Sequence, residues 1–101
     1  MSYNVFFTSL ADSDLEDAFK WYESQKPFLG WEFRENVSHC IDQIMDERVE
    51  YQLYSGNIHK IKLQRFPYKL YYIKDSGKKK ITILALFHIK RNPNEIKATL
   101  G

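Results

Sequence analysis

The sequence predicts an α+β domain in which a helical hairpin packs on one face of a small, mainly antiparallel sheet. Three observations support this class. A short apolar run with β propensity comes first, apolar residues then recur at helical spacing to about residue 48, and the period changes to that of strands after Gly56. A chain of 101 residues with 44% hydrophobic residues suffices for one core, so we expect a single domain over residues 1–101.

The first half of the chain predicts one strand and two amphipathic helices. The strand is expected at Val5–Phe7. Either Ser9 or Asp12 can cap the first helix, whose early turns are acidic as the helix dipole prefers, and this helix should end near Gln25. A proline then interrupts the pattern, and a second apolar stripe runs from Leu29 to about Arg48. The two helices should form the hairpin.

Three strands are expected in the second half, at Ile58–Leu63, Tyr68–Lys74 and Ile81–His88. The turn at Asp75–Gly77 predicts that the last two strands pair as a hairpin. Both alternating sets of the last strand are apolar, which favours a strand covered on both faces, by the helices on one face and by a partner on the other. These sets are Ile81, Ile83, Ala85 and Phe87, and Leu84 and Leu86. The tail at Pro93–Gly101 is expected to form one helical turn.

Charge is distributed unevenly along the chain. Residues 1–50 contain 4 Lys and Arg against 11 Asp and Glu, a net charge of −7, whereas residues 51–101 contain 11 against 2, a net charge of +9. Solubility alone does not require such segregation, which therefore favours an anion-binding surface on the strands. The alternative is that the lysines only solvate a sheet face, and this is the preferred interpretation for the turn lysines at 78–80.

Cations and aromatic rings alternate along the predicted strands. Surfaces that bind nucleic acid combine phosphate contacts from cations with base stacking on rings. The candidates for such contacts are Lys60, Lys62, Arg65, Lys69 and Tyr71, together with His59.

His88 and Arg91 follow the most apolar strand and form the second candidate group. One interpretation makes His88 a proton donor and Arg91 an anion clamp, which suits phosphodiester chemistry. The other is structural, with His88 bonded to a carbonyl and Arg91 paired with a carboxylate of the acidic helices. The residues alone leave both open.

Several classes of site have no support in the sequence. The three histidines lie far apart and no cluster of Cys or carboxylates completes a ligand set, so we expect no metal. The four glycines are scattered singly, which excludes a phosphate loop and predicts that no small-molecule cofactor binds. Cys40 lies on an apolar stripe and should be a small buried hydrophobe in a reducing compartment. No apolar run approaches the roughly 18 residues of a membrane span, so we expect a cytoplasmic protein without a membrane partner.

Short motifs occur in order along nearly the whole chain. They are Asp14-Leu15 with Trp21-Tyr22, Leu29-Gly30 with Glu32-Phe33, Arg65-Phe66-Pro67-Tyr68 with Tyr72, and His88 and Arg91 with Pro93. This series resembles the RelE/ParE superfamily of toxins, in its branch of plasmid stabilisation proteins. The resemblance implies a RelE-like fold of one strand, two helices and three strands. It also implies the toxin of a bacterial type II toxin–antitoxin module, neutralised by a cognate antitoxin protein.

Two mechanisms occur in this superfamily, and the resemblance leaves both open. RelE-like members cleave messenger RNA at the ribosome, whereas ParE-like members inhibit DNA gyrase. For RNA cleavage without a metal, the resemblance implies a catalytic site of Lys60, Lys69, His88 and Arg91, with Lys62 able to replace Lys60. The alternative is a catalytically inert module that serves antitoxin binding and transcriptional autoregulation.

Two positions depart from the pattern of this branch. His59 stands where an arginine is frequent, and a histidine lacks the permanently charged fork of arginine. Phe28 replaces a usual loop glycine, which should alter the geometry of the loop between the helices.

Overall fold

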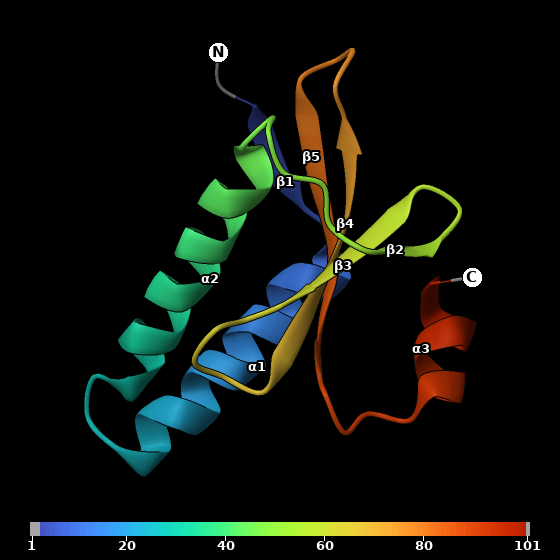
Figure 1. Cartoon of the computed structure of the whole chain (residues 1–101). Coiled ribbons are helices and arrows are strands. Elements are labelled where there is room, and N and C mark those ends of the chain that lie inside the picture. Colours follow the sequence, from blue (N-terminus) through green and yellow to red (C-terminus); the bar gives the residue numbers. More distant parts are fainter. Residues whose placement is uncertain (1–2, 101) are drawn as a thin grey trace.

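The computed structural model describes residues 3–100, which form five strands and three helices (Figure 1). In chain order these are β1 (Asn4–Phe7), α1 (Ser9–Gln25), α2 (Leu29–Met45), β2 (Leu53–Ser55), β3 (Ile58–Lys62), β4 (Tyr68–Asp75), β5 (Lys80–His88) and α3 (Pro93–Leu100). The expected α+β class is confirmed. The short strand β2 was not expected, and α3 has about two turns instead of one.

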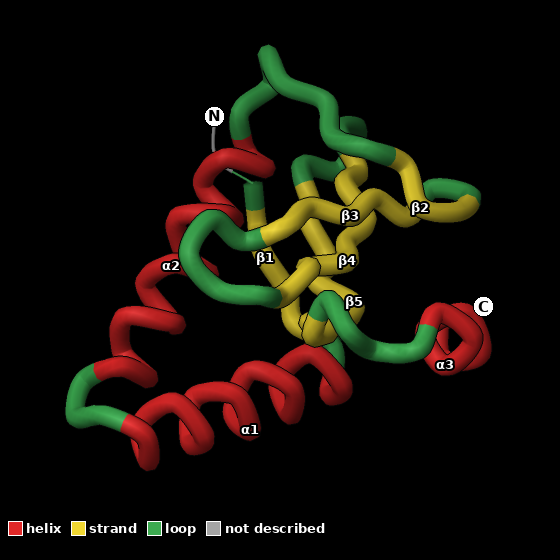
Figure 2. The backbone as a smooth tube through the Cα atoms, turned by 60° about the horizontal axis from the view of Figure 1, so that its bottom comes forward, coloured by secondary structure: helices red, strands yellow, loops and turns green. Residues whose placement is uncertain are grey.

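The strands form one sheet in the order β1-β5-β4-β3-β2. β1 runs parallel to β5, and the other neighbouring pairs are antiparallel, so the sheet is mainly antiparallel as expected. Helices α1 and α2 cover one face as a hairpin, while α3 lies at the opposite face (Figure 2). The face predicted to need a partner is therefore covered in part by α3.

The larger core lies between the helical hairpin and the sheet. Phe33 and Ile44 of α2 are fully buried there with Leu70, Ile81 and Ile83 from the two longest strands. Such apolar burial drives folding at roughly 25 cal/mol per Å² removed from water. A smaller cluster on the opposite face seats α3, whose Ile96 is buried.

A β-bulge in β5 changes which side chains share a face. Tyr71 is opposite Ala85 and Tyr72 is opposite Ile83, so Leu84 is an extra residue without a partner in β4. The strict alternation predicted for this strand therefore holds as far as Leu84 and is wrong from Ala85 onward. Ile81, Ile83 and Leu86 belong to the core under the helical hairpin, whereas Leu84, Ala85 and Phe87 belong to the opposite cluster.

Side chains of the β1–α1 segment bind the backbone of β5 beyond the end of β1. The register of β1 stops at Ile83. The hydroxyl of Thr8 then donates to the carbonyl oxygen of Leu84 at 2.9 Å, and the carboxylate of Asp14 accepts a hydrogen bond from the amide of Leu86 at 3.1 Å. Backbone groups that would otherwise be unpaired at the bulge are thus satisfied.

Thr8 also caps α1, because its hydroxyl oxygen accepts a hydrogen bond from the amide of Ala11 at 3.1 Å. The predicted caps Ser9 and Asp12 are wrong. Both lie inside the helix, since the helix begins one residue after Thr8 and Asp12 contributes only negative charge to its first turn.

The loop between α1 and α2 requires two unusual backbone features. Phe28 has the left-handed conformation with φ of 72°, which glycine adopts at lower cost, and its side chain is 71% exposed. The carboxylate of Glu23 accepts hydrogen bonds from the amides of Phe28 and Gly30, at 3.0 and 2.9 Å. A Cβ at Gly30 would lie 2.7 Å from the carbonyl oxygen of Phe19, so the close approach of the helices requires glycine there.

Cys40 is buried in the core under the helical hairpin, as predicted, and burial raises the pKa of its thiol to about 12. Among residues 3–100, no helix combines the length and apolarity that crossing a membrane demands.

Replacing Asp14 tests its bond to the strand backbone. We expect Asp14→Ala to lower the free energy of unfolding by about 1–3 kcal/mol, because the amide of Leu86 loses its acceptor. Asp14→Asn keeps an acceptor oxygen and should cost clearly less, since burial raises the pKa of Asp14 and so opposes its charge. Urea unfolding of both variants measures the difference, and equal losses would contradict a role for this hydrogen bond.

Replacing Phe28 tests the strain in the helical loop. We expect Phe28→Gly to raise the free energy of unfolding by about 1 kcal/mol, because glycine adopts positive φ without a steric penalty and little buried surface is lost. Phe28→Ala is the matched control, since alanine keeps the Cβ and should bring no gain. A lower stability of Phe28→Gly in thermal or urea unfolding would contradict the left-handed conformation.

Candidate functional site

A small pocket of about 120 Å³ lies where β3, β4 and the end of β5 meet the start of α3. Lys60, Lys69, His88 and Arg91 all line it, so the structure brings together the four residues expected to be catalytic. We call it the cationic pocket. Three of the four side chains are cations, which makes the pocket suited to an anion such as a phosphate group.

The register of β3 and β4 places the strand lysines. Lys60 is opposite Tyr71, and Lys62 is opposite Lys69. Because side chains two apart share a face, these four lie on the sheet face that α1 and α2 leave open. Lys62 does not line the pocket, and its ammonium donates to the carbonyl oxygen of Leu63 at 3.1 Å.

Tyr71 forms part of the pocket wall but is buried, with its ring tilted against Phe87 and edge-on to Tyr54. Burial raises the pKa of Tyr71, which keeps its hydroxyl protonated. The ammonium of Lys60 lies 5.6 Å from the ring centre of Tyr54, a cation–π distance. Tyr71 therefore supports the lysine position and has little free ring surface for stacking.

His88 is half-buried at the end of β5, where the strand stops. Its ring is edge-on to Tyr68, with 5.2 Å between the centroids. The amide of Lys90 donates to Nδ1 at 3.1 Å. The neutral ring therefore has its proton on Nε2, which is a hydrogen-bond donor.

Arg91 is brought beside His88 by a tight turn in which its amide donates to the carbonyl oxygen of His88. Its guanidinium lies 4.4 Å from the ring centre of Phe87, and its Nε is 3.4 Å from the carboxylate of Glu95. The carboxylate partner considered for Arg91 is thus present, but it comes from α3 instead of the acidic helices. Because this ion pair is solvent-exposed and therefore weak, an incoming anion can compete for Arg91.

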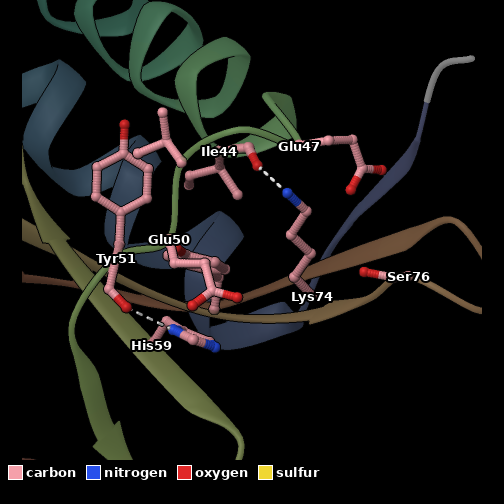
Figure 3. A pocket seen from close by; sticks show the side chains of 9 residues that line it. Ile44, Glu47, Glu50, Tyr51, His59, Lys74 and Ser76 are labelled. Carbon is pink, nitrogen blue, oxygen red and sulfur yellow. Dashed lines mark hydrogen bonds between the residues drawn. The ribbon is translucent and has the colours of Figure 1, made fainter.

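Arg65 and His59 are not brought to the cationic pocket. Arg65 follows β3 and pairs with Glu32 of α2 at 2.9 Å. His59 points toward α2, where its ring stacks on Tyr72 and its Nδ1 lies 3.0 Å from the carbonyl oxygen of Tyr51 (Figure 3). The placement of His59 follows from strand alternation, since His59 and Lys60 must face opposite sides of the sheet.

The lysines at the far end of the sheet have structural partners. Lys74 donates to the carbonyl oxygen of Ile44 at 2.7 Å and so binds the C-terminal turn of α2 (Figure 3). Lys79 pairs with Glu47 at 3.0 Å, and the ammonium of Lys80 lies 5.0 Å from the ring centre of Phe6. These cations are therefore not part of the cationic pocket.

A second concavity, of about 390 Å³, lies beside the first and was not expected from the sequence. It is lined by Trp21 and Tyr22 of α1, Pro67 and Tyr68 at the start of β4, and His88. We call it the aromatic groove. One signal was present in the sequence, because Trp21 falls off the apolar stripe of its helix and should therefore expose a large ring to solvent.

No group of His, Cys, Asp and Glu within the described residues 3–100 is arranged to hold a metal ion.

Comparison with known proteins supports the fold. No protein-family model matches the chain, and no curated protein sequence does so significantly. The structure is similar to one described as the chromosomal ParDE TA system from P. aeruginosa, with a TM-score of 0.69, 14% identity, and coverage of 85% of this chain and 95% of that one.

Two RelE structures are also similar. The RelBE2 toxin–antitoxin complex from Mycobacterium tuberculosis gives a TM-score of 0.58 at 23% identity, covering 87% of this chain and 92% of that chain. A mutant of E. coli toxin RelE in complex with an antitoxin RelBc peptide gives a TM-score of 0.56 at 15% identity, covering 97% of this chain and 93% of that chain. At these identities the likeness establishes the fold. The chain therefore shares the fold of these ParDE and RelE structures, and a RelE-like fold is what its series of motifs implied.

Proposed function

We propose that the protein is the toxin of a type II toxin–antitoxin module and that it cleaves RNA at the cationic pocket. The observation that supports this most is the meeting of Lys60, Lys69, His88 and Arg91 at one pocket of a RelE/ParE-like fold. Inhibition of gyrase by surface contact does not require such a cluster. Phosphodiester cleavage does, because charge builds up on the phosphate in the transition state.

In the proposed reaction the 2′-oxygen of a ribose attacks the adjacent phosphorus, and the bond from phosphorus to the 5′-oxygen breaks. The products are a 2′,3′-cyclic phosphate and a free 5′-hydroxyl. Lys60, Lys69 and Arg91 stabilise the additional negative charge on the phosphate oxygens. The proton of the 2′-hydroxyl passes to water.

His88 supplies the proton for the departing 5′-oxygen from Nε2. To do so, its ring takes up a proton at Nδ1 and gives up the hydrogen bond from the amide of Lys90.

Replacing His88 tests this role. We expect His88→Gln to slow cleavage of messenger RNA by roughly 10² or more, because the proton donor is lost while the cations remain. Lys26→Gln is the control, since Lys26 is exposed at the end of α1 and its loss should not change the rate. Single-turnover cleavage, with and without ribosomes, measures both, and an unchanged rate for His88→Gln would remove His88 from the mechanism.

Gyrase inhibition is the second candidate, because the similar structures include a ParDE system as well as RelE proteins. Induction of the protein alone in bacteria distinguishes the candidates. Messenger RNA fragments without gyrase-linked DNA breaks support the nuclease, whereas breaks and an SOS response without fragments support gyrase. Normal growth without either would favour the inert module that binds an antitoxin and regulates transcription.

We also propose an antitoxin as the partner, acting in the cytoplasm. Two of the similar structures contain toxin–antitoxin pairs or a toxin with an antitoxin peptide. The cationic face between β3 and α3 suits an acidic, amphipathic segment that folds as it binds.

Binding of an antitoxin that prefers the folded state must stabilise the toxin. We expect the melting temperature of the protein to rise when the small protein encoded beside it is added. The rise should grow with the ratio of the concentration of the added protein to its Kd. Differential scanning fluorimetry measures the shift, with an unrelated acidic protein as control. Equal melting temperatures with both additions would contradict the partner.

A further inference from the structure

The aromatic groove and the cationic pocket are neighbours that meet at His88, which lines both. A more open depression on the side of the groove is lined by Trp21, Tyr68, His88 and Arg91, with Asp14 and Asp17 of α1. It reaches from the aromatic rings of the groove to Arg91, which also lines the cationic pocket. In one nucleotide the base and the phosphate are joined through a single sugar, so a nucleotide needs a base site and a phosphate site that are direct neighbours. The groove and the pocket meet this requirement, because they share His88.

The groove has the size and the lining of a ligand site. Its volume of about 390 Å³ falls within the roughly 300–1,000 Å³ of small-ligand pockets. Tyr22 and Tyr68 are held in place by edge-on contacts to each other and to Phe33 or Phe66 in the core. Trp21 is different, because its indole is 57% exposed and keeps ring surface available.

Charge around the groove is asymmetric and gives a ligand one orientation. Asp14 and Asp17 of α1 lie on the side of Trp21, while Lys60 and Lys69 lie beyond His88. Phosphate is repelled from the carboxylates and attracted by the lysines. The amino groups of a base can donate hydrogen bonds to these carboxylates, whereas an apolar side chain of a partner protein would leave the carboxylates without a donor.

We propose that the aromatic groove binds the base of an RNA nucleotide whose phosphate occupies the cationic pocket. This rests on the proposed nuclease function and adds the location of a base. Trp21 supplies the stacking surface, with Tyr68 and His88 as the opposite wall. Stacking on aromatic rings tolerates different bases, so the groove contributes affinity and position more than sequence selection.

The two tryptophans of the chain provide a matched pair of reporters. Trp31 is 55% exposed on α2, beside Phe19 and Arg34, and lines neither concavity, so it matches Trp21 in exposure but lies away from the groove. Trp31→Phe leaves Trp21 as the single tryptophan, and Trp21→Phe leaves Trp31. The probe is a mixed-sequence strand of about six 2′-deoxynucleotides, which binds without being cleaved because it lacks the 2′-hydroxyl.

We expect the probe to quench the fluorescence of the protein that keeps Trp21 and to leave the protein that keeps Trp31 unchanged. The same backbone without bases should not quench Trp21. Trp21→Ala should weaken binding of the probe about tenfold or more, as loss of one stacked base does, while Trp31→Ala should not. Since both side chains are exposed, neither variant removes core packing.

Equal probe affinity for Trp21→Ala and the unchanged protein, or equal quenching of the two tryptophans, would overturn the base site. RNA cleavage that depends on His88 but not on Trp21 would overturn it as well and leave the nuclease intact. Loss of antitoxin binding alone in Trp21→Ala would assign the groove to a protein partner and also overturn the proposal. Quenching restricted to Trp21 in a protein that cleaves no RNA would support the base site and contradict the nuclease.

Discussion

The structure depends on the hydrogen bonding of β5 along both of its edges. β4 pairs with one edge from Lys80 to His88, while β1 pairs with the other edge only as far as Ile83. Beyond that point the side chains of Thr8 and Asp14 replace the missing strand. A buried strand cannot leave its amides unpaired, so this substitution allows β5 to continue to His88. The position of the candidate site is therefore set by residues at the start of α1.

The bulge at Leu84 determines what each face of the sheet contains. It directs Leu86 toward the helical hairpin and Phe87 toward α3. The ring of Phe87 then supports the guanidinium of Arg91, and His88 stands at the strand end between the two faces. Without the bulge, every side chain of β5 after Leu84 would lie on the other side of the sheet. One irregularity in the ladder thus positions both the cation and the imidazole of the candidate site.

The charge segregation along the chain has two physical outcomes. Some cations neutralise the acidic helices, as Arg65 does with Glu32 and Lys79 with Glu47. Others, Lys60 and Lys69 among them, face the side that the helices leave open and gather at the cationic pocket. Exposed pairs of the first kind contribute little stability, whereas cations gathered beside a half-buried imidazole suit the proposed contact with a phosphate group. The segregation therefore pairs some cations with the helices and leaves others on the open face, where they concentrate positive charge at the candidate site.

The sequence by itself determined the class of the fold, the hairpin of helices and the order of most elements, because helical and strand periods are local properties of the chain. It also identified Lys60, Lys69, His88 and Arg91, though not that they meet. Only the tertiary structure decided the bulge, the capping by Thr8, the removal of His59 and Arg65 from the pocket, and the groove beside Trp21. The bulge, the pairing of Arg65 with Glu32 and the groove depend on which residues distant in sequence become neighbours, and a local pattern contains no information about that choice. The capping by Thr8 and the facing of His59 are local, but several adjacent residues could cap the helix, and strand alternation does not say which face of the sheet the helices cover.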